Sequence, residues 1–168
     1  MHVFQPVTPE EVDDGAFTYN GSKVLVTAEK DGKVDSTAAS FGGVGYIWGR
    51  RIIFVCVRGS RLIKEHIDAA GEFSISFLNS KEYRGTLKYM EAVSGRDEDK
   101  IANARLTVNY DDGVPFIDEA DNVITAKVLF GQECGEESFV EKDIIDEFYK
   151  NGDYHYMYIG EIQKILIR

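Results

Sequence analysis

Apolar residues in this chain recur mainly at every second position, which is the spacing of β-strands that bury one face. Residues 23–28 alternate in this way before a turn at Asp31-Gly32, and residues 122–130 and 154–166 show the same pattern. The continuous apolar run at residues 52–57 differs, because it predicts a strand covered on both faces in the middle of a sheet. We therefore expect a protein built mainly of strands.

Helical patterns are short and lie between these strands. Ser60 is the expected N-cap of a helix over residues 61–70, and further helices are expected over 81–91 and 97–105. The Thr8-Pro9-Glu10-Glu11 segment predicts one more short helix near the N-terminus. We expect these helices to pack on the sheet and not to form a separate layer.

The long C-terminal strand indicates how the sheet is arranged. A run that extends over residues 154–166 is long enough to bend around a barrel, so we expect a closed or nearly closed antiparallel barrel. Serines alternate with large apolar residues at 73–78, which predicts that one face of this strand meets something polar. No repeat or linker divides the chain, and residues 1–168 are expected to form a single domain.

Composition narrows the class of protein. The 168 residues carry 19 Lys and Arg against 29 Asp and Glu, a net charge of −10, which disfavours nucleic acid and anionic membranes as partners. No run approaches the roughly 20 apolar residues that span a bilayer, and the N-terminus has no signal-peptide pattern. We expect a cytoplasmic protein in which Cys56 and Cys134 are reduced thiols.

Two segments carry candidate chemistry. Arg58-Gly59-Ser60-Arg61 with Lys64 places three cations, a hydroxyl and a helix N-terminus together, which favours an anion site, although ordinary surface ion pairs would also explain it. The small residues at 36–45 let backbone N–H groups approach a planar ligand, although a hairpin or bulge needs them as well. Together, the two segments suit a flat, phosphorylated cofactor.

The histidines and the tryptophan leave alternatives open. His2, His66 and His155 are too dispersed to indicate a metal site, and none is expected. We expect His66 to face solvent on its helix and His2 to lie on a frayed terminus. His155 is either a structural residue or a residue on the substrate side, and Trp48 is either a core anchor or part of a ligand-site wall.

Five blocks in order resemble the flavin reductase-like, FMN-binding split β-barrel family, which includes flavoredoxins. They are residues 36–45, 48–50, 58–61, 94–100 and 152–162. The resemblance implies an antiparallel split β-barrel of the FMN-binding type, a homodimer with FMN near the interface, and NAD(P)H as a transient electron donor. The sequence has no Rossmann G-x-G-x-x-G motif, which agrees with a nicotinamide cofactor that binds only transiently.

The resemblance also implies roles for particular residues. The implied cofactor-binding set is Ser36, Thr37, Ala38, Ala39, Ser40, Trp48, Arg58, Ser60, Arg61, Lys64, Ser94, Arg96 and Lys100. Ser36 to Ser40 would meet the flavin ring and ribityl chain, and the basic segment would hold the phosphate. His155 would lie at the flavin face as the catalytic residue. The chain departs from the family pattern at Asp35, Ala38, Gly59 and Ile63, so its FMN affinity or flavin choice is open.

The function expected from this resemblance is an NAD(P)H-dependent flavin reductase. One alternative is a flavoredoxin-like electron-transfer flavoprotein that keeps FMN bound and meets a redox protein partner, which its acidic surface could steer. The other is a flavin-binding protein without enzyme activity. The sequence does not separate NADH from NADPH or identify the electron acceptor.

Overall fold

The computed structural model describes residues 22–168. The helix expected from Thr8 and the expectation for His2 lie outside the described residues. The described strands are β1 Val24–Lys30, β2 Lys33–Ala39, β3 Gly42–Ile47, β4 Arg50–Arg58, β5 Glu72–Phe77, β6 Val108–Asp111, β7 Val114–Ile117, β8 Asn122–Glu133 and β9 His155–Ile167. The helices are α1 Leu62–Ala70, α2 Arg84–Ala92, α3 Lys100–Asn103 and α4 Asp143–Phe148, with the short 3-10 helix η2 at Glu136–Ser138.

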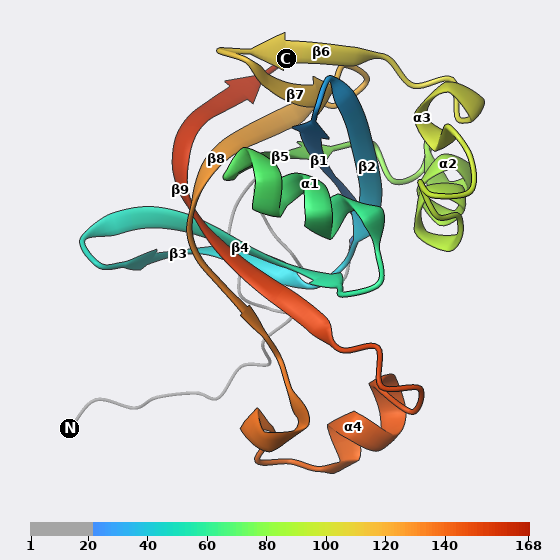
Figure 1. Ribbon diagram of the computed structural model, residues 1–168. Helices are drawn as coiled ribbons and strands as arrows, with labels where there is room; N and C mark the ends of the chain where they lie inside the picture. Colours follow the sequence, from blue (N-terminus) through green and yellow to red (C-terminus); the bar gives the residue numbers. More distant parts are fainter. Residues whose placement is uncertain (1–21) are drawn as a thin grey trace, which may run out of the picture.

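Seven strands form one curved antiparallel sheet in the order β2-β1-β5-β8-β9-β4-β3 (Figure 1). The sheet curls until its two edge strands, β2 and β3, are joined by only two residues. At this link the Phe41 carbonyl accepts from the Cys56 backbone N–H, which continues the pairing of β3 with β4. The expected antiparallel split barrel is thereby confirmed. The separate hairpin of β6 and β7 covers one side of it.

Two apolar cores hold the barrel together, one on each face of the sheet. Strand β1 contributes to both: Val24 and Val26 belong to the inner core, and Leu25 belongs to the outer core under α2 and α3. Helix α1 lies across the inner side, where Ile63 and Ile67 are fully buried (Figure 1). These two residues are four positions apart, which is about one helical turn, so they share the face of α1 that packs against the sheet.

Three expectations for individual elements were wrong. Strand β4 lies next to the edge of the sheet, between β9 and β3, and the middle is formed by β5, β8 and their neighbours. Helix α1 begins at Leu62 with Arg61 at its N-cap, because the Ser60 hydroxyl donates to Asp153 instead. His66 is buried and its Nδ1 lies 3.3 Å from the Ala28 carbonyl oxygen, so it does not face solvent.

The polar partner expected for the serines of β5 is the backbone of β7. The Ser74 hydroxyl donates to the Pro115 carbonyl at 2.6 Å, and the Ser76 hydroxyl accepts from the Ile117 N–H at 3.1 Å. Both serines are fully buried. They bind the β6–β7 hairpin, which was not among the expected elements. Its turn at Asp112-Gly113, where both residues have positive φ, is nevertheless a strong hairpin signal.

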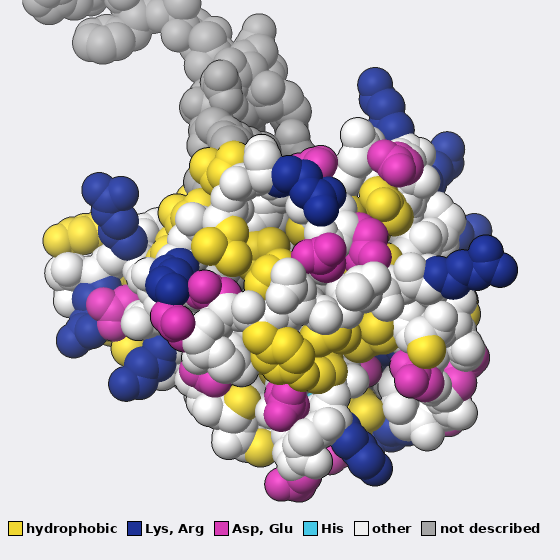
Figure 2. All heavy atoms as spheres, turned by 90° about the horizontal axis from the view of Figure 1, so that it is seen from above, with side chains coloured by type: hydrophobic (Ala, Val, Ile, Leu, Met, Phe, Trp, Pro, Cys, Tyr) yellow, Lys and Arg dark blue, Asp and Glu magenta, His cyan; other side chains and the backbone are white. Residues whose placement is uncertain are grey.

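Strands β8 and β9 pair along nearly their whole length and carry a small lobe, α4, at one end (Figure 1). The opposite end of this ribbon lies beside β6. Seen from that side, apolar side chains gather at the centre of the face with charged side chains around them (Figure 2). Exposed Tyr110 on β6 and Ile165 and Ile167 on β9 are apolar residues of these elements. His155, at the other end of β9, therefore lies far along the strand from this face.

None of the helices within residues 22–168 is long and apolar enough to cross a membrane. Cys56 and Cys134 are both free thiols. No cluster of three or more potential metal ligands occurs in the part of the chain that the structure describes.

Candidate functional site

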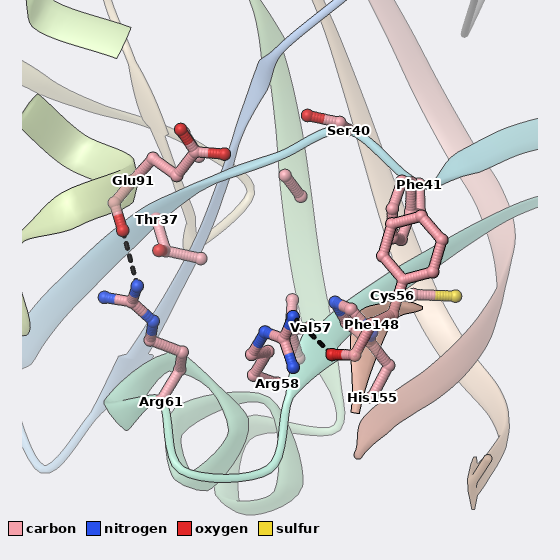
Figure 3. Close-up of a pocket in the computed structure, with 12 residues that line it drawn as sticks. Thr37, Ser40, Phe41, Cys56, Val57, Arg58, Arg61, Glu91, Phe148 and His155 are labelled. Carbon is pink, nitrogen blue, oxygen red and sulfur yellow. Dashed lines mark hydrogen bonds between the residues drawn. The ribbon is translucent and has the colours of Figure 1, made fainter. Parts of the chain in front are cut away.

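A cavity of about 280 Å³ opens where the end of β2, the end of β4 and the start of β9 meet (Figure 3). We call it the arginine cavity. It is lined by Thr37, Ala38, Ala39, Ser40, Phe41, Cys56, Val57, Arg58, Arg61, Glu91, Phe148 and His155. Seven of the predicted site residues thus come together in one place: Thr37, Ala38, Ala39, Ser40, Arg58, Arg61 and His155.

The cavity wall formed by β2 carries small side chains and exposes polar backbone groups along the strand edge. Ala38 and Ala39 end in single methyl groups, so the backbone here can be approached closely. Strand β2 is the last strand on its side of the sheet and pairs only with β1, which leaves its other edge without a strand partner. N–H and C=O groups on such an edge are available to a flat polar ligand.

The basic end of the cavity contains two guanidinium groups held by backbone carbonyls. Arg58 donates to the carbonyls of Asp153 at 2.7 Å and Phe148 at 3.2 Å, whereas Arg61 donates to those of Val93 at 3.0 Å and Glu91. The bonds to Phe148 and Glu91 are drawn in Figure 3. Within residues 22–168, neither guanidinium forms an ion pair with a carboxylate. Carbonyls fix the side-chain geometry but leave both positive charges available to an anion.

The other end of the cavity is aromatic. The Phe41 ring contacts the rings of Phe148 and His155 edge-on, with centroid distances of 5.8 and 5.2 Å. Phe41 and Phe148 are both partly exposed, so they present apolar surface to the opening. This combination of an aromatic end and a cationic end suits a ligand that is flat at one side and anionic at the other.

His155 is buried in this aromatic end and is neutral at physiological pH. Burial, reinforced by the nearby Arg58 charge, lowers the pKa of its imidazole from 6.5 to about 4. Its Nδ1 lies 2.7 Å from the Tyr149 hydroxyl, whose pKa is raised by burial, so the phenol stays protonated. A phenol that donates to Nδ1 leaves the ring proton on Nε2, where it is available to a ligand.

Three residues that were predicted to contact the phosphate or the cofactor instead bind carboxylates outside the cavity. The Ser60 hydroxyl donates to Asp153 at 2.7 Å, the Lys64 ammonium pairs with Asp68 at 2.7 Å, and the Arg96 guanidinium pairs with Glu65. The alternative of ordinary surface ion pairing therefore describes Lys64 and Arg96, whereas Arg58 and Arg61 fit an anion site.

The remaining predicted residues also lie outside the arginine cavity. Ser36 is fully buried and accepts a hydrogen bond from Thr27 at 3.0 Å. Trp48 forms the exposed turn of the β3–β4 hairpin with a positive φ, so it is neither a core anchor nor part of this wall. Ser94 caps a local turn by accepting from the Arg96 N–H, and Lys100 is buried beside Asp35.

Five further residues line the cavity that were not predicted as site residues: Phe41, Cys56, Val57, Glu91 and Phe148. Phe41 lies within the small-residue segment, and Cys56 and Val57 directly precede Arg58, so their position was a usable signal. Glu91 and Phe148 come from α2 and α4, and nothing in the local sequence connects these helices with β4. Burial raises the pKa of the Cys56 thiol to about 12, so it serves as an apolar wall.

Comparison with known proteins identifies relatives of this chain. The model of the flavin reductase-like domain family matches residues 18–168. Flavoredoxin from Methanosarcina acetivorans superimposes with a TM-score of 0.70 at 21% identity, over 98% of this chain and 76% of that chain. Flavoredoxin of Desulfovibrio vulgaris (Miyazaki F) gives 0.68 at 22% identity, over 94% and 76%.

A third solved structure, an FMN-binding protein from Thermus thermophilus with bound 1-cyclohex-2-enone, gives a TM-score of 0.66 at 18% identity, over 99% of this chain and 80% of that chain. At these identities the similarity establishes the shared fold. No curated protein matches the chain.

The neutral His155 predicts a loss of stability on acidification. The folded-state pKa of about 4 lies below the ordinary value of 6.5, so protons bind the unfolded chain more readily and stability falls as the pH drops through this interval. From about pH 7.5 to about pH 5.5, the free energy of unfolding should fall by about 1 kcal/mol because of this group. Urea denaturation measures this loss. A His155→Asn variant should lack this part of the pH dependence, and an unchanged profile would contradict the assignment.

Proposed function

Because the chain belongs to the flavin reductase-like domain family, we propose that it binds FMN in the arginine cavity and acts as an oxidoreductase with NAD(P)H as electron donor. The observation that carries this proposal is the pair of guanidinium groups, Arg58 and Arg61, which backbone carbonyls hold in place and which pair with no carboxylate within residues 22–168. A terminal phosphate carries the negative charge that this arrangement lacks.

The shape of the cavity supports a flavin as the rest of the ligand. Ala38 and Ala39 leave the edge of β2 accessible, and Phe41 offers an apolar ring beside it. Bound flavin would supply the hydride and electron chemistry itself. The chain's own residues would then hold the phosphate, keep the polar ring edge hydrogen-bonded and limit access of water. Ala38 supplies no hydroxyl at its position, so contacts there would come from backbone groups.

His155 would act as a hydrogen-bond donor on the substrate side. Its ring is neutral and its Nδ1 is engaged by Tyr149, which leaves Nε2 for a nicotinamide carboxamide or a flavin edge. This role requires no proton transfer by the ring.

A second copy of the chain would complete the site. The cavity volume of about 280 Å³ lies just below the range of ligand sites, which span roughly 300–1,000 Å³. Tyr46, Trp48 and Phe130 are exposed on β3, its hairpin turn and β8, which is the composition of an interface core. We therefore include a homodimer in the proposed function.

A flavoredoxin-like electron carrier is the second candidate. The net charge of −10 favours association with a basic redox protein, and solved flavoredoxins share this fold. A carrier would retain FMN and reduce a protein acceptor, whereas a flavin reductase would be stimulated by added free flavin.

FMN binding should depend on the two cavity arginines. Replacing both in Arg58→Ala/Arg61→Ala should weaken FMN by about 2–4 kcal/mol, because each charged hydrogen bond contributes roughly 1.5–3 kcal/mol and the two need not add. Calorimetric titration of the apoprotein with FMN and FAD measures the affinity and the preference. Lys64→Ala/Arg96→Ala, which removes two cations paired with carboxylates, is the matched control and should bind FMN normally. Equal affinities in both double variants would exclude the arginine cavity as the phosphate site.

Turnover should depend on His155 more than FMN binding does. Loss of one neutral hydrogen bond costs about 0.5–1.5 kcal/mol, so His155→Ala should lower kcat/KM for NAD(P)H by roughly three- to tenfold. His155→Asn retains a donor and should lose less. Anaerobic bleaching of bound flavin by NADH and NADPH, read near 450 nm, measures the rates. If both variants lose FMN outright, His155 supports the fold and not the reaction.

The proposed homodimer can be tested by measuring the mass of the protein in solution, without an FMN-binding or activity assay. Sedimentation velocity at micromolar concentration should give about twice the chain mass of 18.9 kDa, because the exposed aromatic residues would be buried between copies. Trp48→Ser/Phe130→Ser should shift the protein toward a monomer. A monomer that is fully loaded with FMN would contradict the proposed dimeric site.

A further inference from the structure

Another cavity shares the lining residue Glu91 with the arginine cavity. We call it the lysine cavity. It has a volume of about 390 Å³ and is lined by Ser22, Lys23, Ser80, Arg84, Leu87, Lys88 and Glu91. Three of its seven lining residues are cations, although the chain as a whole carries ten more acidic than basic groups. The proposed function does not use this cavity.

Two of these cations have no acidic partner in the part of the chain that the structure describes. Arg84 and Lys88 are exposed one helical turn apart on α2, and neither forms an ion pair with any residue in the described range 22–168. The first turn of α2 also contains no acidic residue. Cations and a helix N-terminus therefore add to a positive potential in this cavity, and the carboxylate that lines it, Glu91, pairs with Lys23 and not with Arg84 or Lys88.

Glu91 connects the two cavities, because it lines both of them. Its carboxylate pairs with the Lys23 ammonium on the side of the lysine cavity. Its carbonyl accepts from Arg61 on the side of the arginine cavity, as Figure 3 shows. A ligand that reaches from one cavity to the other would thus pass a single residue, and its two ends would meet separate groups of cations.

We propose that the lysine cavity binds the adenosine phosphate end of a dinucleotide, namely the 2′-phosphate half of NADPH, while the nicotinamide reaches the flavin in the arginine cavity. This inference rests on the proposed function, because it extends the same site. Two unpaired cations and Lys23 match a group that carries a phosphomonoester more closely than they match the adenosine of NADH, which has only a hydroxyl at the 2′ position.

The test uses adenosine 2′,5′-bisphosphate as the probe and the FMN-loaded protein as its target. Calorimetry should show binding that weakens with added salt, and 5′-AMP should bind more weakly because it lacks the 2′-phosphate. In Arg84→Ala/Lys88→Ala, the affinity for the bisphosphate should fall by about tenfold or more. The control variant Lys33→Ala/Lys127→Ala removes two exposed cations that line neither cavity, and it should bind the probe as the wild type does.

FMN titration of the same proteins separates this inference from the proposed function. All three proteins should take up FMN with equal affinity. FMN-loaded wild type that does not bind the bisphosphate, or a double variant that binds it unchanged, overturns the inference and leaves the proposed function standing. A wild-type protein that takes up no FMN overturns the proposed function itself. A double variant that loses affinity for FAD, but not for the bisphosphate, would assign the cavity to a flavin dinucleotide and overturn the inference.

Discussion

The candidate site depends on the antiparallel pairing of β4 with β9, which places Arg58 opposite His155. Just beyond these strands, the Gly59 N–H donates to the Tyr154 carbonyl at 2.9 Å, and Asp153 accepts from both the N–H and the hydroxyl of Ser60. These bonds continue the pairing into the loops. A slip of one residue would turn every side chain to the opposite face of its strand, so the register itself holds the cation and the imidazole at one cavity.

Much of the barrel was predictable from the sequence because local alternation is a strong signal where one face of a strand is buried. The position of β4 was not, since a run of apolar residues shows burial but does not give the order of strands. For the site, the small residues of β2 and the basic segment after β4 were identified correctly as neighbours. Ser60, Lys64 and Arg96 were misplaced. The acidic partners of Ser60 and Arg96 come from other elements, and sequence spacing does not reveal those contacts. The Lys64–Asp68 pair, in contrast, has the i,i+4 spacing of a single helix and was visible in the sequence.

The Ser94 to Lys100 block shows that a family motif can have a structural use. Lys100 and Asp35 are both buried, with 3.9 Å between Nζ and Oδ1, and burial lowers the pKa of the lysine while raising that of the aspartate. Gly95 lies against this pair, since a Cβ there would come within 2.3 Å of Asp35 Oδ1. Gly95 and Lys100 therefore fix the loop after α2 to the start of β2, the strand whose other end lines the arginine cavity. Asp35, where the chain departs from the family pattern, therefore serves this contact and does not line the arginine cavity.

The same loop explains how an acidic protein keeps a cationic cavity. If Arg61 were paired with a carboxylate, its charge would be cancelled and an incoming phosphate would have to compete with that partner. The carbonyls of Glu91 and Val93, at the C-terminal end of α2, orient the guanidinium through partial charges only. Asp35 and Lys100 hold this loop, since they form a buried pair and Lys100 also donates to the Val93 carbonyl. The position of Arg61 therefore depends on two residues that do not line the arginine cavity. Changes at that pair should therefore alter the cavity by moving α2, even though neither residue lines it.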